Sequence, residues 1–419
     1  MSTATDPLES APGTPTEGAD RPNLPLAGVT VIDFGQIYQG PYATLLMAKA
    51  GANVIKVEPP GTGEPLRMRA AASKGAGVPL VMLNSNKRAV TLNLKHARGK
   101  ELLKEMVAKA DILLENFTPD VMNKLGVGWS VLREVNPRLI YASGSGYGLS
   151  GPNRDAMAMD LTVQAASGIM SITGMPDGPP VKCGAAVVDF MSGIHLYAAV
   201  MTALYERSVT GRGRLVEVSM QESVFTALAS NLGMLYKQDG KVPPRTANRH
   251  GGLAVCPYNV YEAADGHIAI NVIKEIHWEG LLKIMDRDDL IGDPRYASNK
   301  ERVQRMEETD ALVEAWTRTK TRDEIMALAK TYRLPLGPVR DLVEVSNDPH
   351  MHERGMLEYL DHPDHGRIVV PTSPLRFHEA DKVETVPSPA IGAHNDEVYG
   401  EWLGLGAEGV EELRRMGVI

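Results

Sequence analysis

The sequence is poor in cysteine, with two in 419 residues, Cys183 and Cys256. Two cysteines are too few for a disulfide framework or a cysteine-based metal cluster, and such sparing use is typical of a reducing cytoplasm. Phenylalanine is scarce as well, with 5 residues against 20 methionines. The sequence therefore argues against a disulfide-stapled secreted fold and predicts a cytoplasmic protein whose core is aliphatic and methionine-rich.

Long apolar runs are also missing. No continuous apolar stretch reaches the length of about 18 residues that a membrane-spanning helix needs. Residues 1–24 carry acids and prolines and no apolar run, so they do not resemble a signal peptide and are predicted to form a disordered tail. No membrane partner is expected.

Positive charge is in deficit, because the net charge is −8. This balance argues against general nucleic-acid binding, although it leaves room for a local basic groove that holds an anionic ligand. A chain of 419 residues exceeds what one hydrophobic core usually serves, so two domains are expected.

The first residues with a clear pattern form a strand–helix–strand sequence. Val29–Phe34 and Asn53–Val57 are short β-branched runs, and between them Pro41 opens a helical stretch that ends near Ala50. This order predicts a parallel βαβ unit. The turn after the first strand lacks the G-x-G-x-x-G pattern, which disfavours a nicotinamide dehydrogenase.

The alternation of strands and helices continues and predicts a doubly wound α/β sheet. Further strands are expected at Ala89–Leu94, Ile112–Leu114, Leu139–Ala142 and Leu215–Val218. Ligands bind beyond the carboxyl ends of such strands. The expected loops at those ends are Gln36–Gln39, Glu58–Arg67, Asn116–Phe117 and Ser143–Gly148.

A smaller α+β domain is predicted to be inserted into the larger one. Its signals are a hairpin formed by Val255–Glu262 and Gly266–Val272, and then helices near Ile276–Met285, Asn299–Thr317 and Arg322–Tyr332. We expect a large Rossmann-like domain at 25–220, a linker with a glycine loop at 221–253, the small domain at 254–345, and at 346–419 a return linker with helices that cover the large domain.

The stretch TGMPDGPP presents a single acid, Asp177, on a stiff turn. Pro presets φ, Asp bonds its own backbone and Gly accepts positive φ, so a plain surface turn is one interpretation. The flanking segments Leu161–Ile172 and Ala185–Phe190 look buried, however. A lone carboxylate on a turn rooted in a core is a candidate nucleophile. Asp160 lies near the start of the preceding helix, where an N-cap is the simple interpretation.

With these residues in place, the chain resembles the class III CoA-transferases, the CaiB/BaiF family that includes formyl-CoA transferase and the carnitine CoA-transferase. The segments that carry the resemblance are LAGVTVIDFG, GANVIKVEPPGTGEPLR, LNSNKRAVTLNLK, ADILLENFTPDVMNKLG, NPRLIYASGSGYG, TGMPDGPP, TGRGRLVEVSM and DPHMHERGML. Together they run from about Leu26 to the C-terminal Gly-Val-Ile.

The resemblance implies a homodimer interlocked like two linked rings, and Asp177 as the catalytic nucleophile. It implies an aspartyl-acyl anhydride and then an aspartyl-CoA thioester, with the CoA thioester as substrate and neither a metal nor a permanently bound cofactor. The CoA-binding positions implied are Ile37, Lys95, Asn116, Phe117, Lys124 and Tyr147. Tyr38, Gln39, Gly251 and Gly252 correspond to substrate-facing segments, the glycines belonging to a loop that covers the site.

Departures from the family pattern bear on the substrate. Formyl-CoA transferase has a Gln where this chain has Tyr38, and Pro59 replaces an expected basic residue, so oxalate and formate are disfavoured. Succinyl-CoA or another short-chain acyl-CoA is the donor that the resemblance implies. Arg249 and His250 beside the glycine loop are hypothesised to meet the second carboxylate of a diacid acceptor.

Two alternatives remain open. The related α-methylacyl-CoA racemases use a His and an Asp as a pair of bases, the Asp in a G-H-D-x-N-Y motif. Here Asp160 is retained, while the preceding residue is Met159 instead of His and the Asn-Tyr pair is absent. The other alternative is an acyl-CoA-binding protein without catalytic activity, which the presence of Asp177 disfavours.

Overall fold

The computed structural model describes residues 22–72, 77–237, 239–241 and 245–419, so most of the predicted tail lies outside the described residues. The central element is a six-stranded sheet of order β3-β2-β1-β4-β5-β6, and every pair in it is parallel. Its strands are β1 (Thr30–Phe34), β2 (Asn53–Glu58), β3 (Arg88–Thr91), β4 (Ile112–Glu115), β5 (Ile140–Ser145) and β6 (Leu215–Ser219). The predicted doubly wound sheet is therefore confirmed.

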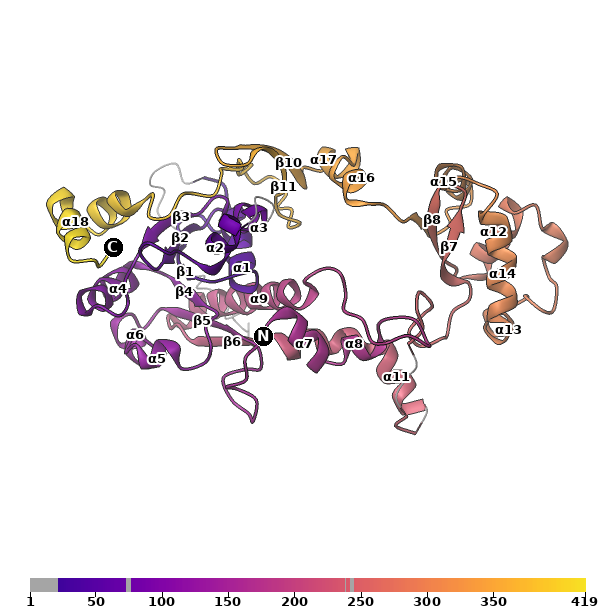
Figure 1. Cartoon of the computed structure of the whole chain (residues 1–419), viewed down its shortest axis with the longest axis horizontal. Coiled ribbons are helices and arrows are strands. Elements are labelled where there is room, and N and C mark those ends of the chain that lie inside the picture. Colours follow the sequence, from indigo (N-terminus) through magenta and orange to yellow (C-terminus); the bar gives the residue numbers. More distant parts are fainter. Residues whose placement is uncertain (1–21, 73–76, 238, 242–244) are drawn as a thin grey trace, which may run out of the picture.

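Helices cover both faces of this sheet, as Figure 1 shows. The helices of this part are α1 (Gln39–Lys49), α2 (Pro65–Ala72), α3 (Val78–Asn84), α4 (Ala97–Lys109), α5 (Val121–Lys124), α6 (Trp129–Val135), α7 (Asp160–Ala166), α8 (Ile169–Ile172), α9 (Val187–Thr210), α10 (Met220–Phe225), η2 (Thr226–Leu228) and α11 (Ala229–Lys237).

Alternate residues of each strand belong to opposite cores. Val31 of β1 packs with Met47 of α1 and Leu196 of α9, whereas the next residue, Ile32, packs with Leu102 of α4 on the other face. All of these side chains are almost completely buried. Strands with apolar residues on both sides are required here because helices exclude water from both faces.

The C-terminal segment lies along the edge strand β3. Asn395 accepts a hydrogen bond from the Thr91 backbone N–H at 2.9 Å, and the His394 N–H donates to the Ala89 carbonyl at 2.9 Å. The π-helical η4 (Asp396–Trp402) and α18 (Gly406–Arg415) follow and pack on the α4 face. The otherwise open edge of the sheet is thus paired.

A smaller body surrounds the antiparallel sheet β7-β8-β9. Its elements are β7 (Tyr258–Ala263), β8 (Gly266–Asn271), α12 (Glu275–Ile284), η3 (Asp288–Leu290), α13 (Asn299–Gln304), α14 (Met306–Thr317), α15 (Arg322–Thr331) and β9 (Leu336–Pro338). It has a core of its own around Tyr261, Ile268, Trp278 and Val313. Further along are α16 (Leu342–Ser346), α17 (Pro349–Glu353) and the hairpin β10 (Leu357–His362) and β11 (Gly366–Pro371).

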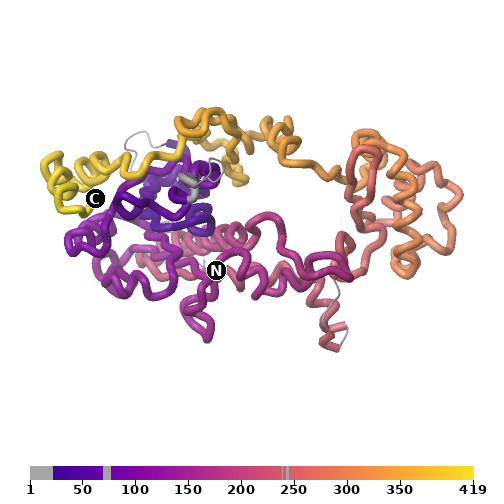
Figure 2. The backbone as a smooth tube through the Cα atoms, viewed as in Figure 1, coloured from indigo at the N-terminus to yellow at the C-terminus, as the bar shows by residue number. Residues whose placement is uncertain are grey.

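The two bodies are joined by separate segments of the chain. In Figures 1 and 2, α7 and α8 extend from the sheet toward the smaller body before α9 brings the chain back to β6. The chain then leaves the sheet through α10 and α11, reaches the smaller body and returns through α16 and α17, so the trace forms an open ring.

Three expectations for helices and loops were wrong. The loop expected at Glu58–Arg67 ends early, because α2 begins at Pro65, a residue that suits the first turn of a helix. The helix expected over Asn299–Thr317 breaks at Arg305, whose ψ of 40° is not helical. The buried helix expected before Asp177 is divided at Gly168, with φ of 92°, into α7 and α8, and α8 has no buried residue.

Helix α9 is long and apolar enough to cross a membrane by length and composition alone, with a mean hydropathy of 1.5. One side of it packs on the sheet through Leu196, Val200 and Ala203. Such packing is usual for the core helix of a globular protein, and charged residues such as Asp189 and Arg207 interrupt the helix, so it contains no continuous apolar run of membrane-spanning length.

Candidate active site

The sheet order places a crevice at the carboxyl ends of β1 and β4. The connections from these neighbouring strands leave to opposite sides, and ligands of doubly wound sheets bind at such switch points. A pocket of about 280 Å³ lies there. Its lining includes Gln36, Ile37, Gln39, Asn116, Phe117 and Ser145.

A second pocket, of about 480 Å³, lies beyond the ends of β2 and β3. Its lining includes Pro59, Leu94 and Lys95, and it shares Gln36 and Phe117 with the first pocket. The two pockets are thus adjacent and differ in character, since the second has an exposed lysine at its rim. An elongated ligand with an anionic end fits this combination.

The structure brings together only some of the predicted CoA-binding residues. Ile37, Asn116 and Phe117 line the first pocket, and Lys95 lines the second. Lys124 is exposed on α5, and Tyr147 packs against the apolar cluster around Val163 and Met220. Asn116 has a structural contact besides: its side chain bonds both the N–H and the carbonyl of Gln36, at 2.6 and 3.0 Å.

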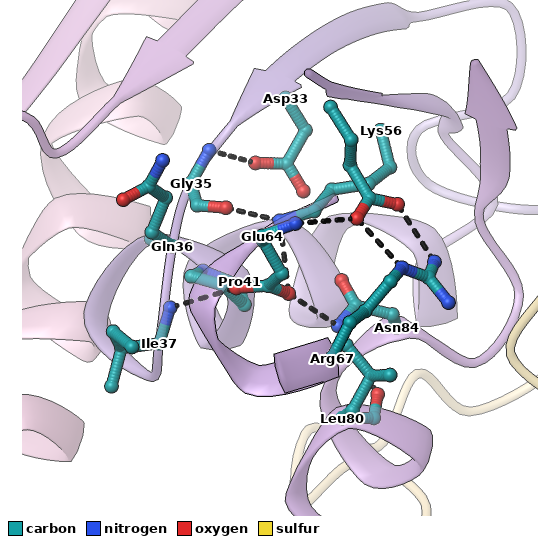
Figure 3. Close-up of polar contacts among 12 residues, drawn as sticks. Asp33, Gly35, Gln36, Ile37, Pro41, Lys56, Glu64, Arg67, Leu80 and Asn84 are labelled. Atoms are coloured by element: carbon teal, nitrogen blue, oxygen red, sulfur yellow. Dashed lines mark hydrogen bonds and ion pairs between the residues drawn. The ribbon is translucent and has the colours of Figure 1, made fainter. Parts of the chain in front are cut away.

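Buried charges lie next to the turn between β1 and α1, and Figure 3 shows Asp33, Lys56 and Glu64 among them. Lys87 contacts Asp33 at 3.0 Å, and Lys56 contacts Glu64 at 3.4 Å, with all four side chains at most 2% exposed. Burial alone would raise the pKa of Asp33, but the charges of Lys87 and Lys56 outweigh it and hold that pKa below its ordinary value. Burial lowers the pKa of Lys87 to about 8 despite the attraction of Asp33.

The outer part of this cluster ties the loop after β2 to the sheet. Burial would raise the pKa of Glu58, but the Arg67 guanidinium, bonded to it at 2.7 Å through each of two nitrogens, lowers it. Arg67 also donates to the Pro389 carbonyl at 3.1 Å. The predicted site does not include these residues, although the sequence carries a signal for them, because Asp33 and Lys56 are single charges within apolar strands.

Asp177 lies on the predicted turn. The Gly178 N–H donates to the Met175 carbonyl at 3.1 Å, which closes residues 175–178 as a β-turn. Arg245 donates to the carbonyls of Met175 and Gly178 and so clamps the turn from a distant part of the chain. The Asp177 side chain is exposed and bonds to none of the residues that the structure describes. It does not line either pocket.

Asp160, by contrast, is fully engaged. One carboxylate oxygen accepts the Val188 and Asp189 N–H groups at 2.9 and 3.3 Å, and the other accepts from Gln164 at 2.5 Å. Val188 and Asp189 are in the first turn of α9, so this carboxylate satisfies N–H groups that a helix start leaves open. Asp160 is thus a helix cap, of α9 instead of its own helix α7.

The residues predicted near the glycine loop lie on the segment between α11 and β7. This segment contacts the Asp177 turn, since the Ala247 N–H donates to the Gly174 carbonyl at 3.1 Å. Gly251 and Gly252 follow a few residues later, next to Asn231 and Ser230 of α11. Arg249 pairs with Asp310 at 2.8 Å, so it has a structural partner in the smaller body. His250 stacks edge-on against Tyr258.

Tyr38 belongs to an aromatic group at the start of α1. Its ring stacks on Phe190 with the centroids 5.8 Å apart, and Phe190 also meets Tyr42 edge-on at 4.9 Å. The neighbouring Gln39 is 2% exposed, lines the first pocket and lies against Gly144.

Comparison with known proteins identifies the family. Residues 26–395 match CoA-transferase family III. The chain is 35% identical to a formyl-CoA:oxalate CoA-transferase of Streptomyces avermitilis, over 94% of this chain and 99% of the relative. It is 33% identical to a succinyl-CoA–D-citramalate CoA-transferase of Chloroflexus aurantiacus, over 96% of this chain and 100% of the relative.

The fold agrees with these relatives. A crystal structure of a CaiB/BaiF family protein from Brucella suis superposes with a TM-score of 0.78 at 31% identity, covering 90% of this chain and 99% of that one. The chain therefore belongs to CoA-transferase family III, the CaiB/BaiF family, and is a class III CoA-transferase.

Proposed function

We propose that this enzyme moves CoA from succinyl-CoA to a carboxylic acid acceptor, with Asp177 as the nucleophile. The observation that carries the proposal is the exposed Asp177 carboxylate, which projects from a turn clamped by Arg245 and bonds to none of the described residues. A carboxylate without competing partners is free to attack a thioester.

The reaction follows from carboxylate chemistry. An Asp177 oxygen attacks the thioester carbonyl, the C–S bond breaks, and CoA leaves as a thiolate, giving a mixed anhydride. The thiolate attacks the Asp177 carbonyl carbon and releases the donor acid as its carboxylate, giving an aspartyl-CoA thioester. The acceptor carboxylate displaces the thiolate into a second anhydride. The thiolate then attacks the acceptor's acyl carbon, which forms the new acyl-CoA and restores Asp177.

We assign CoA to the adjacent pockets beyond the strand ends, with Lys95 toward the phosphates and Ile37, Asn116 and Phe117 along the pantetheine. Lys124 and Tyr147 remain candidate contacts from the family resemblance. The anhydride and the thioester both hydrolyse readily, so water must be excluded around Asp177. Gly251 and Gly252, on the segment that contacts the Asp177 turn, are the proposed cover.

Succinyl-CoA is the proposed donor for two reasons. The citramalate relative from Chloroflexus aurantiacus is named for succinyl-CoA. The relative from Streptomyces avermitilis is named for formyl-CoA and oxalate, but Tyr38 replaces the glutamine of formyl-CoA transferase, and its ring is engaged with Phe190. An aromatic side chain supplies no amide for a small dicarboxylate such as oxalate.

We also propose that the enzyme is a cytoplasmic homodimer in which the two chains form interlocked rings. Each ring would comprise a large domain at 25–220 and a small one at 254–345, connected by 221–253 and 346–419. The outer side of α9 exposes Ile194, Tyr205 and Val209, at 48%, 75% and 73%, and Leu161 of α7 is 53% exposed. Apolar area of this kind on neighbouring helices is typical of an interface. A second copy would cover it and exclude water near Asp177.

The test is an assay of CoA thioesters by liquid chromatography, with succinyl-CoA and a panel of diacids, hydroxyacids and aromatic acids as acceptors. Loss of succinyl-CoA with equal gain of one new acyl-CoA supports the proposal. If instead no acid is converted, while a 2-methylacyl-CoA exchanges its α-proton in deuterated water, the enzyme acts as a racemase. The contacts of Asp160 with the start of α9 disfavour that second function.

A further inference from the structure

The turn between β1 and α1 is held by side chains from elsewhere in the chain. The Gly35 N–H donates to Asp33 at 2.7 Å, and the Gly35 carbonyl accepts from Lys56 of β2. At the next residue, Asn116 bonds both main-chain groups of Gln36. Side-chain partners for consecutive backbone groups fix the path of a loop that no sheet or helix ladder holds.

Ile37 is the exceptional residue of this turn. Its φ is 62°, in the left-handed region that β-branched residues rarely adopt. Its N–H donates to Glu64 at 3.0 Å. Figure 3 shows this contact beside the Lys56–Glu64 pair. A strained conformation persists only where its surroundings impose it, and such residues cluster at active sites.

Glu64 is built into the sheet end like a core residue. It is 1% exposed, and its carboxylate also contacts Lys56 at 3.4 Å and the Asn84 amide at 3.3 Å. The Glu64 N–H donates to Glu58 at 2.9 Å. Oε1 of Glu64 therefore contacts Lys56 and Asn84, and Oε2 accepts the hydrogen bond from the Ile37 N–H.

The strained turn is followed directly by Gln39, whose side chain lines the first pocket. The Gln39 side chain lies so close to Gly144 that a Cβ on this glycine would be 2.6 Å from the Gln39 amide oxygen. A Cβ on Gly193 would be 2.8 Å from the main-chain carbonyl oxygen of Gln39. Its Nε2 is buried without a hydrogen-bond partner among the described residues. A buried donor left open in a substrate pocket indicates a ligand oxygen. Relaxation at Ile37 would displace this amide, because Gln39 is only two residues further on.

We propose that Glu64 is a positioning residue for CoA transfer: it holds Ile37 in the left-handed conformation, and so directs the Gln39 amide at an acyl oxygen of the bound substrate. This role rests on the proposed function of the same site. Glu64 does not touch the substrate in this arrangement, and it acts through the main chain of the turn.

The test is a double-mutant cycle of Glu64→Ala and Ile37→Gly. Glycine adopts positive φ without strain, so the turn of the Ile37→Gly variant no longer depends on Glu64. The activity is the exchange of labelled succinate into succinyl-CoA, the affinity for CoA is measured by calorimetry, and stability is followed as Tm. Glu275→Gln is the matched control, because it breaks the ion pair with the buried Arg302 in the smaller body.

Glu64→Ala is expected to lower kcat for exchange about 100-fold, which is the loss typical when a catalytic group is misplaced by about 1 Å. The Kd of CoA should change less than about threefold. In the Ile37→Gly background, Glu64→Ala should lower kcat at most about tenfold. Equal losses in both backgrounds would overturn the role, as would a loss of the same size in Glu275→Gln. If Glu64→Ala does not fold, Glu64→Met takes its place in the cycle, because methionine is close to glutamate in size but offers no oxygen to the Ile37 N–H.

A wrong choice of donor can be distinguished from a wrong role for Glu64. Wild-type enzyme that gives no exchange with succinyl-CoA has a different donor, and crystal structures of the CoA complexes then decide the role of Glu64. If Ile37 keeps its positive φ and Gln39 does not move in the Glu64→Ala variant, the positioning role of Glu64 is refuted. If Ile37 leaves the left-handed region and Gln39 shifts, the role is supported.

Discussion

At the scale of single residues, ionisable groups buried in the strands govern how the fold responds to pH. Glu115, the last residue of β4, is 6% exposed and accepts a hydrogen bond from the Phe117 N–H at 2.8 Å. Burial raises its pKa to about 7, although contacts with Ser143, Phe117 and Tyr141 oppose the shift. The folded protein therefore holds a proton that the unfolded chain has already released.

Glu115→Gln should consequently stabilise the protein at high pH. The native pKa is raised, so the stability gained from holding the proton is complete below about pH 4.5 and is lost as the pH rises through about 7. Relative to wild type, the variant should gain about 2.5 kcal/mol between pH 5 and pH 8. Urea denaturation at both pH values measures this gain, and an equal difference between variant and wild type at both would contradict it.

The residues that could be predicted are those whose role is local. The turn that carries Asp177 follows from Pro176 and Gly178 alone, and the structure has it. The contact of Ile37 with Glu64 could not be predicted, because a positive φ at isoleucine opposes its intrinsic preference and depends on a carboxylate from another loop. The prediction that the segment before Asp177 is buried was wrong for the single chain, because α8 has no buried residue.

At the scale of elements, the long helix α9 depends on a cap from another helix. Its own N-cap position, Ala186, supplies no side-chain hydrogen bond, and Asp160 of α7 accepts two of the open N–H groups instead. The sequence indicates an N-cap at Asp160, but it cannot say which helix start receives it, since that depends on how α7 and α9 pack.

Asp160→Ala should therefore act on stability and only weakly on catalysis. Loss of the cap should lower the free energy of unfolding by about 1–2 kcal/mol. CoA transfer should stay within about tenfold of wild type, since a lost general base typically costs 100-fold or more. The two quantities are measured by urea denaturation and by the thioester assay. A loss of activity with unchanged stability would favour a catalytic role for Asp160.

The edge of the sheet offers a second test at this scale. Asn395 bonds both the backbone N–H and the hydroxyl of Thr91, each at 2.9 Å, and it is 7% exposed. Asn395→Ala leaves that N–H unsatisfied and should cost about 1–3 kcal/mol. Thermal unfolding measures the change, and Asn347→Ala in the turn after α16 serves as the control; equal losses in the two variants would refute a special role for the edge.

At the scale of the whole molecule, the alternation of strands and helices predicts the parallel sheet, because each parallel pair requires a crossover. The open ring in Figure 1 was not predictable from these patterns, since it depends on segments with few local signals. Exposed apolar side chains on α7 and α9 have no explanation within one chain. The proposed second copy supplies one.

Tyr205→Glu should therefore disrupt assembly. The wild-type enzyme is expected at twice the 45.4 kDa of one chain, and a buried charge at Tyr205, 75% exposed in the single chain, should give monomers with lower activity. Light scattering after size exclusion measures the mass. Met416→Glu, on the C-terminal segment, is the control and should remain dimeric; a dimer that persists in Tyr205→Glu would place the interface elsewhere.

The most direct measurement is mass spectrometry of the intact enzyme after incubation with succinyl-CoA and trapping with hydroxylamine or borohydride. A covalent CoA adduct or trapped product on the peptide that contains Asp177, absent from Asp177→Ala, is the predicted result. An adduct that persists in Asp177→Ala, or no adduct together with α-proton exchange on a 2-methylacyl-CoA, would contradict the role of Asp177 as the nucleophile of CoA transfer.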